Sequence, residues 1–471
     1  MKVLLMTPPF CEVARETDVT PQRGAIITSI KNRLGFAQGV QPPFGLMYIS
    51  AVLKDAGHRV SLVDGTFHTL ESLVACAQIN PAPVVGVSTV TFNWEPTKAL
   101  IAALRSVLPQ ACIVVGGAHA TAWREHCLEE SPGIDVLVYG EGERTMLEVM
   151  SRLANGEQLD GTEGTILRRD GQILINPPRP YVKDLDELPF PDRDSIDISR
   201  DRPSPMFYCR LPHTSLFGSR GCPYRCTFCA SEKKVRLRTP ENMVDEMELA
   251  VNQYGVRDIT FYDETFTLSK QRALAFCKEV LRRGVRVSWS VNARVDTVDL
   301  EILQWMKKAG CWRVLYGIES GVQRNLDTLR KGITLGQVQD AVRATREAGL
   351  EVLGMFMFGV PGETFADGEA TIRLAIDLDL DYAIFSNVTP FPGTELYEQV
   401  KDSPGFQGIA YMTPLRINYV PDSMSKAELQ NLIHVAYRRF YMNPRYVLKV
   451  LRKLRSPADF VRHLRGFLML L

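Results

Sequence analysis

The stretch "GSRGCPYRCTFCA" (218–230) places Cys222, Cys226 and Cys229 in the spacing C-x3-C-x2-C. It begins at the end of an apolar run, "SLFGSR" (215–220), which is typical of a buried strand. Thiolates grouped on one loop are typical ligands of zinc or of an iron–sulfur cluster. Structural zinc needs four ligands, usually in two pairs, and no second C-x2-C follows. Three thiolates would leave one iron of a [4Fe–4S] cluster open to a substrate or cofactor.

Two other interpretations of these cysteines remain open at this point. His213 lies nearby in the sequence and could complete a zinc site. The three thiols could also be unrelated residues of the core, where cysteine packs as a small hydrophobe.

The cysteine loop opens a series of apolar runs separated by helical patterns. After "SLFGSR" come "DITFYDE", "VSWSVNA", "RVLYGIES", "VLGMFMFG" and "YAIFSNVTP". This alternation predicts a partial (β/α)6 barrel over 206–400, with its chemistry at the carboxyl ends of the strands. Polar side chains do follow the strands there: Asp263, Glu264, Asn292, Arg294, Glu319 and Ser320.

The residues before the barrel show a second alternation. Apolar, β-branched runs such as "KVLLMT", "VVGVST" and "CIVVGG" alternate with helical segments over 1–150. The fold class is therefore α/β, with an N-terminal doubly wound, Rossmann-like domain whose ligand binds at the strand carboxyl ends. Residues 151–205 are predicted to be a linker with a hairpin at Asp170-Gly171. Residues 401–471 are predicted to be helical and basic.

Composition narrows the class of protein. The 471 residues carry a net charge of +1 and are 45% hydrophobic, which is typical of a soluble globular chain and gives no global signal for nucleic-acid binding. Ten cysteines are too few for a disulfide scaffold of this length. The N-terminal "MKVLLMTPPF" is predicted to be a strand rather than a signal peptide. No run reaches 18 apolar residues, so we expect a cytoplasmic protein without a transmembrane helix.

"GCPYRCTFC" resembles the signature of the radical S-adenosylmethionine (SAM) enzymes. The resemblance implies that Cys222, Cys226 and Cys229 bind a [4Fe–4S] cluster whose fourth iron takes the amino and carboxylate groups of SAM. By the same resemblance Phe228 lies near the adenine, and Asp263 and Glu264 meet the SAM amino group. Asn292 and Arg294 are then expected to contact the carboxylate or the ribose of SAM. Glu319 and Ser320 are expected to contact its ribose or its methionine part. Taken singly, each carboxylate could equally be a solvated loop charge.

The chain as far as residue 400 or so resembles the cobalamin-dependent radical SAM enzymes. The matching segments include "TPPF" (7–10), "PPFGLMYISAVLKDAGHRVSLVD" (42–64), "VVGGAHATA" (114–122) and "YGEGE" (139–143). The resemblance implies a cobalamin site, and glycines there would let the backbone approach a large ligand. The candidate residues are Pro8, Pro9, Gly45, Asp64, Ser88, Thr91, Gly116, Gly117, His119, Gly140 and Glu141. A plain nucleotide-binding or regulatory domain is the alternative.

One departure from cobalamin proteins concerns the D-x-H-x-x-G motif, whose histidine binds cobalt from below. Asp64 is present, but Thr66 stands at the histidine position, and His68 comes two residues late. We therefore expect no histidine below the cobalt. His119 is a candidate contact to the cofactor, or else a hydrogen-bonded surface residue.

The resemblance implies an enzyme in which a 5′-deoxyadenosyl radical takes hydrogen from an unactivated C–H and cobalamin delivers a methyl group. Methyl transfer to a lipophilic small molecule is the first prediction. A radical cyclase or oxidative ring-forming enzyme of tetrapyrrole type is the alternative, and a non-enzymatic iron–sulfur and cobalamin sensor or electron carrier is a third. An electron donor such as flavodoxin or ferredoxin is the expected partner.

The segment 438–471 is rich in Lys and Arg, with Asp459 as its one acidic residue. Apolar residues recur at helical spacing, among them Val447, Leu451, Phe460 and Leu464. Two arrangements fit this pattern: a helix in the interface of a membrane, giving peripheral contact at its inner face, or a helix whose apolar face packs on the barrel.

Overall fold

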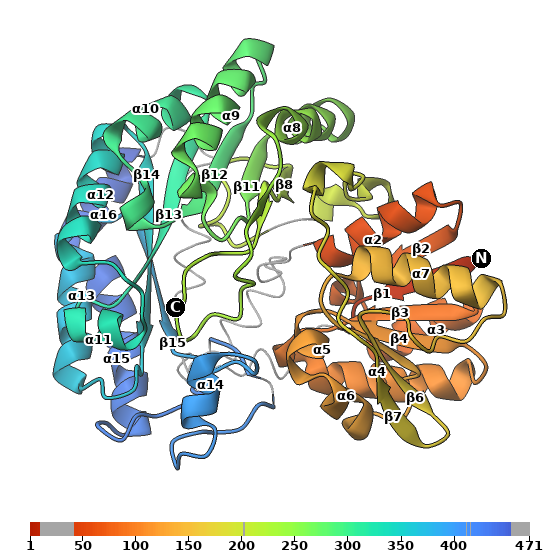
Figure 1. Cartoon of the computed structure of the whole chain (residues 1–471). Helices are drawn as coiled ribbons and strands as arrows, with labels where there is room; N and C mark the ends of the chain where they lie inside the picture. Colours follow the sequence, from red (N-terminus) through yellow and green to blue (C-terminus); the bar gives the residue numbers. More distant parts are fainter. Residues whose placement is uncertain (10–41, 201–202, 411, 415, 454–471) are drawn as a thin grey trace.

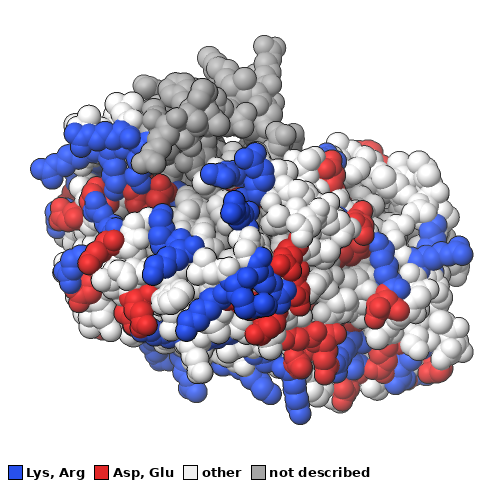
Figure 2. All heavy atoms as spheres, turned by 90° about the horizontal axis from the view of Figure 1, so that it is seen from above, with Lys and Arg blue, Asp and Glu red and all other residues white. Residues whose placement is uncertain are grey.

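The computed structural model describes residues 1–9, 42–200, 203–410, 412–414 and 416–453. Figure 1 shows two lobes side by side, one built from the N-terminal third of the chain and one from the remainder. Lys and Arg are interspersed with Asp and Glu over the face seen in Figure 2.

The N-terminal lobe is a seven-stranded sheet in the order β2-β1-β3-β4-β5-β6-β7. Pairing is parallel from β2 through β5 and antiparallel at β5-β6 and β6-β7. The strands are β1 (Lys2–Met6), β2 (Arg59–Val63), β3 (Val84–Ser88), β4 (Cys112–Gly116), β5 (Val136–Val138), β6 (Thr165–Arg169) and β7 (Gln172–Ile175).

Helices cover both faces of this sheet. On one side lie α2 (Phe44–Asp55) and α7 (Gly142–Ala154), and on the other α3 (Leu70–Ile79), α4 (Trp94–Val107), α5 (Ala118–Trp123) and α6 (Glu125–Glu130) (Figure 1). Strand β1 shows why: Val3 and Leu5 enter the core under α2, while Leu4 and Met6 enter the core on the opposite face. Because successive side chains alternate across a strand, a continuous apolar run requires cover on both faces.

The hairpin at Asp170-Gly171 extends the N-terminal sheet. Asp170 has φ 49° and Gly171 has φ 79°, the two positive values that a tight two-residue hairpin turn requires. Strands β6 and β7 pair with each other, and β6 pairs with β5. Part of the segment predicted to be a linker thus contributes strands to the first lobe. Three short 3-10 turns, Leu185–Glu187, Arg193–Ser195 and Ile198–Arg200, follow it.

The second lobe is a six-stranded parallel sheet in the order β15-β14-β13-β12-β11-β8. Its strands are β8 (His213–Leu216), β11 (Asp258–Phe261), β12 (Ser288–Ala293), β13 (Cys311–Glu319), β14 (Glu351–Phe358) and β15 (Tyr382–Asn387). The helices between them are α8 (Pro240–Tyr254), α9 (Lys270–Arg283), α10 (Leu300–Lys308), α11 (Gln323–Thr328), α12 (Leu335–Glu347) and α13 (Phe365–Asp377). They form the outer layer of an open barrel (Figure 1).

The last described helices follow β15, and one of them covers the open edge of this barrel. They are α14 (Glu395–Val400), α15 (Lys426–Tyr441) and α16 (Pro444–Lys453). From α15, the hydroxyls of Tyr437 and Tyr441 bond to the backbone N–H and carbonyl of Phe385 and Ala383 on β15. An edge strand with unpaired backbone groups is thereby satisfied by side chains. In the described part of the chain, no helix has the length and apolar character needed to cross a membrane.

Candidate active site

The cysteine loop is closed at its base by a two-stranded ribbon. Strands β9 (Ser219–Arg220) and β10 (Arg236–Leu237) pair antiparallel, so residues 221–235 form a loop between them. Gly221 begins this loop with φ 85°, and a Cβ there would lie 2.4 Å from the carbonyl oxygen of Lys234. Only glycine fits such a close approach of two backbone segments.

The three cysteines on this loop are free thiols, each partly exposed. The Sγ of Cys229 accepts a hydrogen bond from the backbone N–H of Ser231 at 3.4 Å. Burial raises the pKa of Cys226, while the nearby cations Lys331 and Arg294 act in the opposite direction. Backbone N–H groups and cations around the sulfurs suit an anionic cluster.

Among the described residues, no three His, Cys, Asp or Glu side chains converge closely enough to hold a single metal ion. A tetrahedral zinc site requires such convergence. In a [4Fe–4S] cluster each thiolate binds a different iron, so the ligands stand further apart. Three free thiols on one loop match the number of ligands that leaves one iron of such a cluster open.

Asp263 lies beneath the cysteine loop rather than in an open site. Its side chain is fully buried. It accepts hydrogen bonds from the N–H of Gly218 and the hydroxyl of Ser219, each at 2.6 Å, and pairs with Arg272 at 3.1 Å. Burial raises the pKa of Asp263, and Arg272 acts against this shift. Because both carboxylate oxygens are used, Asp263 positions the strand that leads into the loop.

Glu264, by contrast, is exposed and accepts a hydrogen bond from Ser231 of the cysteine loop at 2.8 Å. Asn292, at the end of β12, donates to the backbone carbonyl of Asp263 at 3.2 Å. Of the two neighbouring carboxylates that the sequence singled out, Glu264 is the one left available to a cation.

Arg294 is buried and already has partners. It forms a bidentate ion pair with Asp296, with both N–O distances at 2.9 Å, and donates to the carbonyl of Lys331. Its guanidinium lies 3.5 Å from the ring centroid of Tyr224, which is a residue of the cysteine loop. A cation stacked on an aromatic ring holds both side chains in place. Tyr224 was missed in the sequence because its partner, Arg294, is distant in the chain and belongs to the end of another strand.

Glu319 and Ser320 follow β13. Glu319 adopts φ 68°, a left-handed conformation that is uncommon for a residue with a Cβ, and its carboxylate pairs with buried Lys331 at 2.7 Å. Strained backbone of this kind clusters at functional sites. Ser320 is fully buried and bonds to Asn325 and Thr371. Lys331 also lies 5.9 Å from the ring of Phe228, so the structure joins β13 to the cysteine loop.

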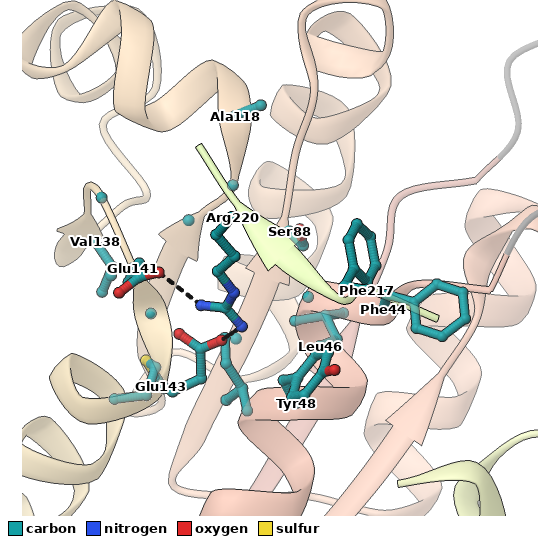
Figure 3. Close-up of a pocket in the computed structure, with 18 of the residues that line it drawn as sticks. Phe44, Leu46, Tyr48, Ser88, Ala118, Val138, Glu141, Glu143, Phe217 and Arg220 are labelled. Carbon is teal, nitrogen blue, oxygen red and sulfur yellow. Dashed lines mark hydrogen bonds and ion pairs between the residues drawn. The ribbon is translucent and has the colours of Figure 1, made fainter. Parts of the chain in front are cut away.

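A cavity of about 510 Å³ separates the strand ends of the N-terminal lobe from the cysteine loop. We call it the interdomain cavity. Its walls are mostly apolar and include Phe44 and Leu46 from the N-terminal lobe and, next to them, Phe217 from the second lobe (Figure 3). Six of the candidate cobalamin residues line it: Gly45, Ser88, Gly116, Gly117, Gly140 and Glu141. From the second lobe, Arg220, Gly221, Arg236 and the carboxylate Glu264 line it as well.

Gly117 shows why a glycine is needed at this strand end. Its φ is 106°, and a Cβ would lie 2.4 Å from the carbonyl oxygen of Thr89. The backbone after β4 can therefore pass close to the neighbouring loop and leave the cavity open.

The other candidate cobalamin residues lie elsewhere. Pro8 and Pro9 follow β1, and neither lines the interdomain cavity. Asp64 and His68 line a separate cavity of about 280 Å³, where His68 bonds to Ser72 at 2.8 Å.

His119 and Thr91 form a hydrogen-bonded pair, with 3.2 Å between Nδ1 and Oγ1. His119 is fully buried beside Trp94, burial lowers its pKa to about 4, and its Nε2 has no hydrogen-bond partner. It is a neutral, buried side chain rather than the surface residue that the sequence allowed.

Residues 216–375 match the model of the Radical SAM superfamily, and residues 33–150 match that of the B12 binding domain. An uncharacterised methyltransferase of Pyrococcus horikoshii is 31% identical over 460 residues, which cover 95% of this chain and 94% of the relative. The chain belongs to the cobalamin-dependent radical SAM enzymes. The alternative of a non-enzymatic sensor or carrier is set aside.

Other relatives of this cobalamin-dependent radical SAM enzyme differ in their reactions. The anaerobic magnesium-protoporphyrin IX monomethyl ester cyclase of Cereibacter sphaeroides is 30% identical, covering 86% of this chain and 68% of the relative. Among solved structures, the radical SAM methyltransferase TsrM from Kitasatospora setae aligns with a TM-score of 0.70 at 21% identity, covering 98% of this chain and 90% of that one. The enzyme OxsB aligns with a TM-score of 0.73 at 18% identity, covering 99% and 72%. These two likenesses show a shared fold.

The cofactors of this radical SAM enzyme are a [4Fe–4S] cluster, SAM and cobalamin. The residues present fit each of them. Three free thiols lie on one loop, and polar groups of the barrel strands lie next to that loop. An apolar cavity with a glycine-lined rim lies at the strand ends where a doubly wound domain binds its ligand.

Proposed function

We propose that this enzyme transfers a methyl group to an unactivated carbon of a lipophilic small molecule. The observation that carries the proposal is the interdomain cavity, because it is bounded by the candidate cobalamin residues on one side and by the cysteine loop on the other. A methyl carrier and a radical-generating site must face one shared space if both are to reach the same substrate carbon. The largely apolar lining favours an apolar substrate.

The cluster with SAM supplies a radical able to remove hydrogen from C–H, and cobalamin supplies a methyl carrier. The chain's own residues hold and shield these groups. In this proposal Cys222, Cys226 and Cys229 hold the cluster. Glu264, exposed beside the loop, receives the SAM amino group, since a carboxylate suits a cation.

The neighbouring polar residues act mainly by positioning. Asp263, Arg294 and Ser320 are buried with their polar groups paired, so they hold the strand ends around the site. Phe44 and Phe217 pack edge to face, with ring centroids 5.7 Å apart, at the border of the two lobes. Aromatic walls of this kind exclude water from a reactive intermediate.

The test is anaerobic incubation of the reconstituted enzyme with SAM that carries a labelled methyl group, a flavodoxin or ferredoxin as reductant, and a panel of lipid and tetrapyrrole candidates. Methyl transfer predicts 5′-deoxyadenosine together with a product that has gained one labelled methyl. A variant in which Cys222, Cys226 and Cys229 are all Ala should give neither. Label transfer by that variant would contradict the proposal.

The ring-forming alternative has support of its own, since the cyclase relative is 30% identical over 427 residues. A cyclase or oxidase would yield a product that has lost hydrogen and carries no label. Mass spectrometry of the same reactions distinguishes the two outcomes.

We also propose that the enzyme meets its substrate at the inner face of a membrane. Helix α16 supports this, because its apolar side faces outward: the exposed fractions of Val447, Leu448 and Leu451 are 43%, 49% and 57%. Two of its cations face the barrel, where Lys449 pairs with Asp379 and Lys453 with Asp381, whereas Arg445 and Arg452 are exposed. Packing of the apolar side on the barrel remains the alternative, and Tyr446 of α16 does pack against the barrel core. Residues 454–471 of the same prediction lie outside the described residues.

A further inference from the structure

We propose that Glu141 is a positioning residue that couples cobalamin binding to the conformation of the cysteine loop. Glu141 belongs to the N-terminal lobe and follows β5, whereas the loop belongs to the barrel. The proposal rests on the cofactors of the family and not on which reaction follows. It would therefore stand if the enzyme proved to be a cyclase.

Glu141 holds both ends of the cysteine loop. Its carboxylate lies 2.7 Å from a guanidinium nitrogen of Arg220 and 2.8 Å from one of Arg236. Arg220 and Arg236 are directly opposite each other in the β9-β10 ribbon. The residues between them, 221–235, contain all three cysteines. One carboxylate of the other lobe thus fixes the two points from which the loop departs.

Neighbouring groups reinforce this contact. Glu143 pairs with the second terminal nitrogen of Arg220 at 2.6 Å, so the guanidinium bridges two carboxylates (Figure 3). Glu141 also accepts the N–H of Val182, and Arg236 donates to the carbonyl of the same residue. The side chains of Arg236 and Glu143 are only 4% and 6% exposed. Charge-assisted bonds with little exposure are much stronger than surface ion pairs.

The same residues line the interdomain cavity. Glu141, Arg220 and Arg236 all belong to its wall, and Gly140, which has φ 77°, comes directly before Glu141. A ligand that orders residues 139–142 necessarily orders the carboxylate on which both arginines depend. Conversely, a cluster that orders the loop orders the two arginines and preorganises the cavity wall. Ordering by one ligand lowers the ordering cost for the other, which gives positive coupling.

Coupling of this kind is reciprocal. If a bound cluster tightens cobalamin binding by some factor, bound cobalamin must tighten cluster binding by the same factor. Typical couplings between two sites lie at about 5- to 150-fold in affinity. We expect the cluster-loaded enzyme to bind hydroxocobalamin at least about 5-fold more tightly than the cluster-free enzyme.

The experiment titrates hydroxocobalamin into full-length protein with and without the reconstituted cluster, following the cobalamin absorbance. The ratio of the two Kd values is the readout. Glu141→Gln keeps an acceptor for Val182 but removes the charge, so we expect the ratio to fall below about 2. Glu143→Gln removes the charge of one of the two carboxylates that pair with Arg220 and should give an intermediate ratio. The matched control is Glu187→Gln, whose carboxylate pairs with exposed Arg144 and should leave the ratio unchanged.

The ratio separates coupling from simple ligand contact. If Glu141 only touched cobalamin, Glu141→Gln would weaken both Kd values equally and leave the ratio as in the wild type, and this result would overturn the proposal. A wild-type ratio near one would overturn it as well. Should Glu141→Gln fail to fold, a double-mutant cycle of Arg220→Gln and Glu143→Gln tests the same chain of contacts through the non-additivity of the ratio.

Discussion

At the scale of single residues, the three loop cysteines make the most direct prediction. Anaerobic reconstitution should load about four irons, and SAM should perturb the electron paramagnetic resonance signal of the reduced cluster. Replacing any one of Cys222, Cys226 or Cys229 by Ala should abolish formation of 5′-deoxyadenosine. Cys209→Ala is the matched control, since this cysteine lies outside the loop. A single loop variant that still cleaves SAM at the wild-type rate would refute the ligand assignment.

Glu363 makes a prediction about pH and stability. It is fully buried after β14 and accepts the N–H groups of Gly359 and Val360. Burial raises its pKa from 4.5 to about 7 even though these N–H groups act against the shift. The folded state therefore keeps a proton that the unfolded state loses, and stability falls as the pH rises from 4.5 to about 7.

The pKa shift of Glu363 corresponds to a loss of about 3 kcal/mol in the free energy of unfolding. Glu363→Gln should remove this loss, because the amide does not titrate. Urea unfolding at pH 5 and at pH 8 measures the change in the free energy of unfolding. Between these two pH values the wild type should lose more stability than the variant. Equal losses would show that Glu363 has an ordinary pKa.

His68 tests the expectation that no histidine binds the cobalt from below. It lines the smaller cavity with Asp64, away from the interdomain cavity, and bonds to Ser72. We therefore expect His68→Ala to leave the electron paramagnetic resonance spectrum of bound cobalt(II) unchanged. Nitrogen hyperfine structure that disappears in this variant would show that the histidine is a cobalt ligand.

At the scale of elements, the connector between the lobes is fastened by a buried arginine. Arg193 pairs with Glu246 of α8 at 2.7 Å and donates to the carbonyl of Ser215 on β8. Both charged side chains are fully buried, and Arg238 also contacts Glu246. The connector thus packs against the first strand and the first helix of the barrel.

Removal of Arg193 should be costly, because it leaves a buried carboxylate with one cation fewer. We expect Arg193→Met to lower the free energy of unfolding by about 3 kcal/mol, measured by urea denaturation. Arg144→Met, which breaks an exposed pair with Glu187, should change it by less than about 0.5 kcal/mol. An effect of Arg193→Met as small as that expected for Arg144→Met would mean that the buried ion pair of Arg193 contributes nothing to stability.

At the scale of the whole molecule, the exposed side of α16 predicts binding to anionic membranes. Arg445 and Arg452 of this helix are exposed as well, so co-sedimentation with anionic liposomes should be strong at low salt and weaker at high salt, because surface charges are screened. Replacing Val447, Leu448 and Leu451 together by Ser should reduce binding without loss of folding, since these side chains are already exposed. Leu281→Ser, at another exposed leucine, is the control. Unchanged binding by the triple variant would exclude this helix as a membrane contact.

Local pattern was sufficient for the architecture. The spacing of Cys222, Cys226 and Cys229 and the alternation of apolar runs with helical segments predicted a doubly wound domain followed by a partial barrel. Both signals are local, because a strand or helix reveals itself through the periodicity of its own residues. The same signals placed the polar candidates at strand ends, since parallel strands end on one side of a sheet.

Partners that are distant in sequence could not be found in this way. Asp263 and Glu264 are neighbours in the chain, yet contacts with Gly218, Ser219 and Arg272 bury the first, while the second stays exposed. A sequence reports which residues carry charge, but the three-dimensional packing determines which charges are paired. The orientation of α16 is a further case. Its periodicity defined two faces but not which of them meets the barrel, and in the structure Lys449 and Lys453 face the barrel because they pair with Asp379 and Asp381.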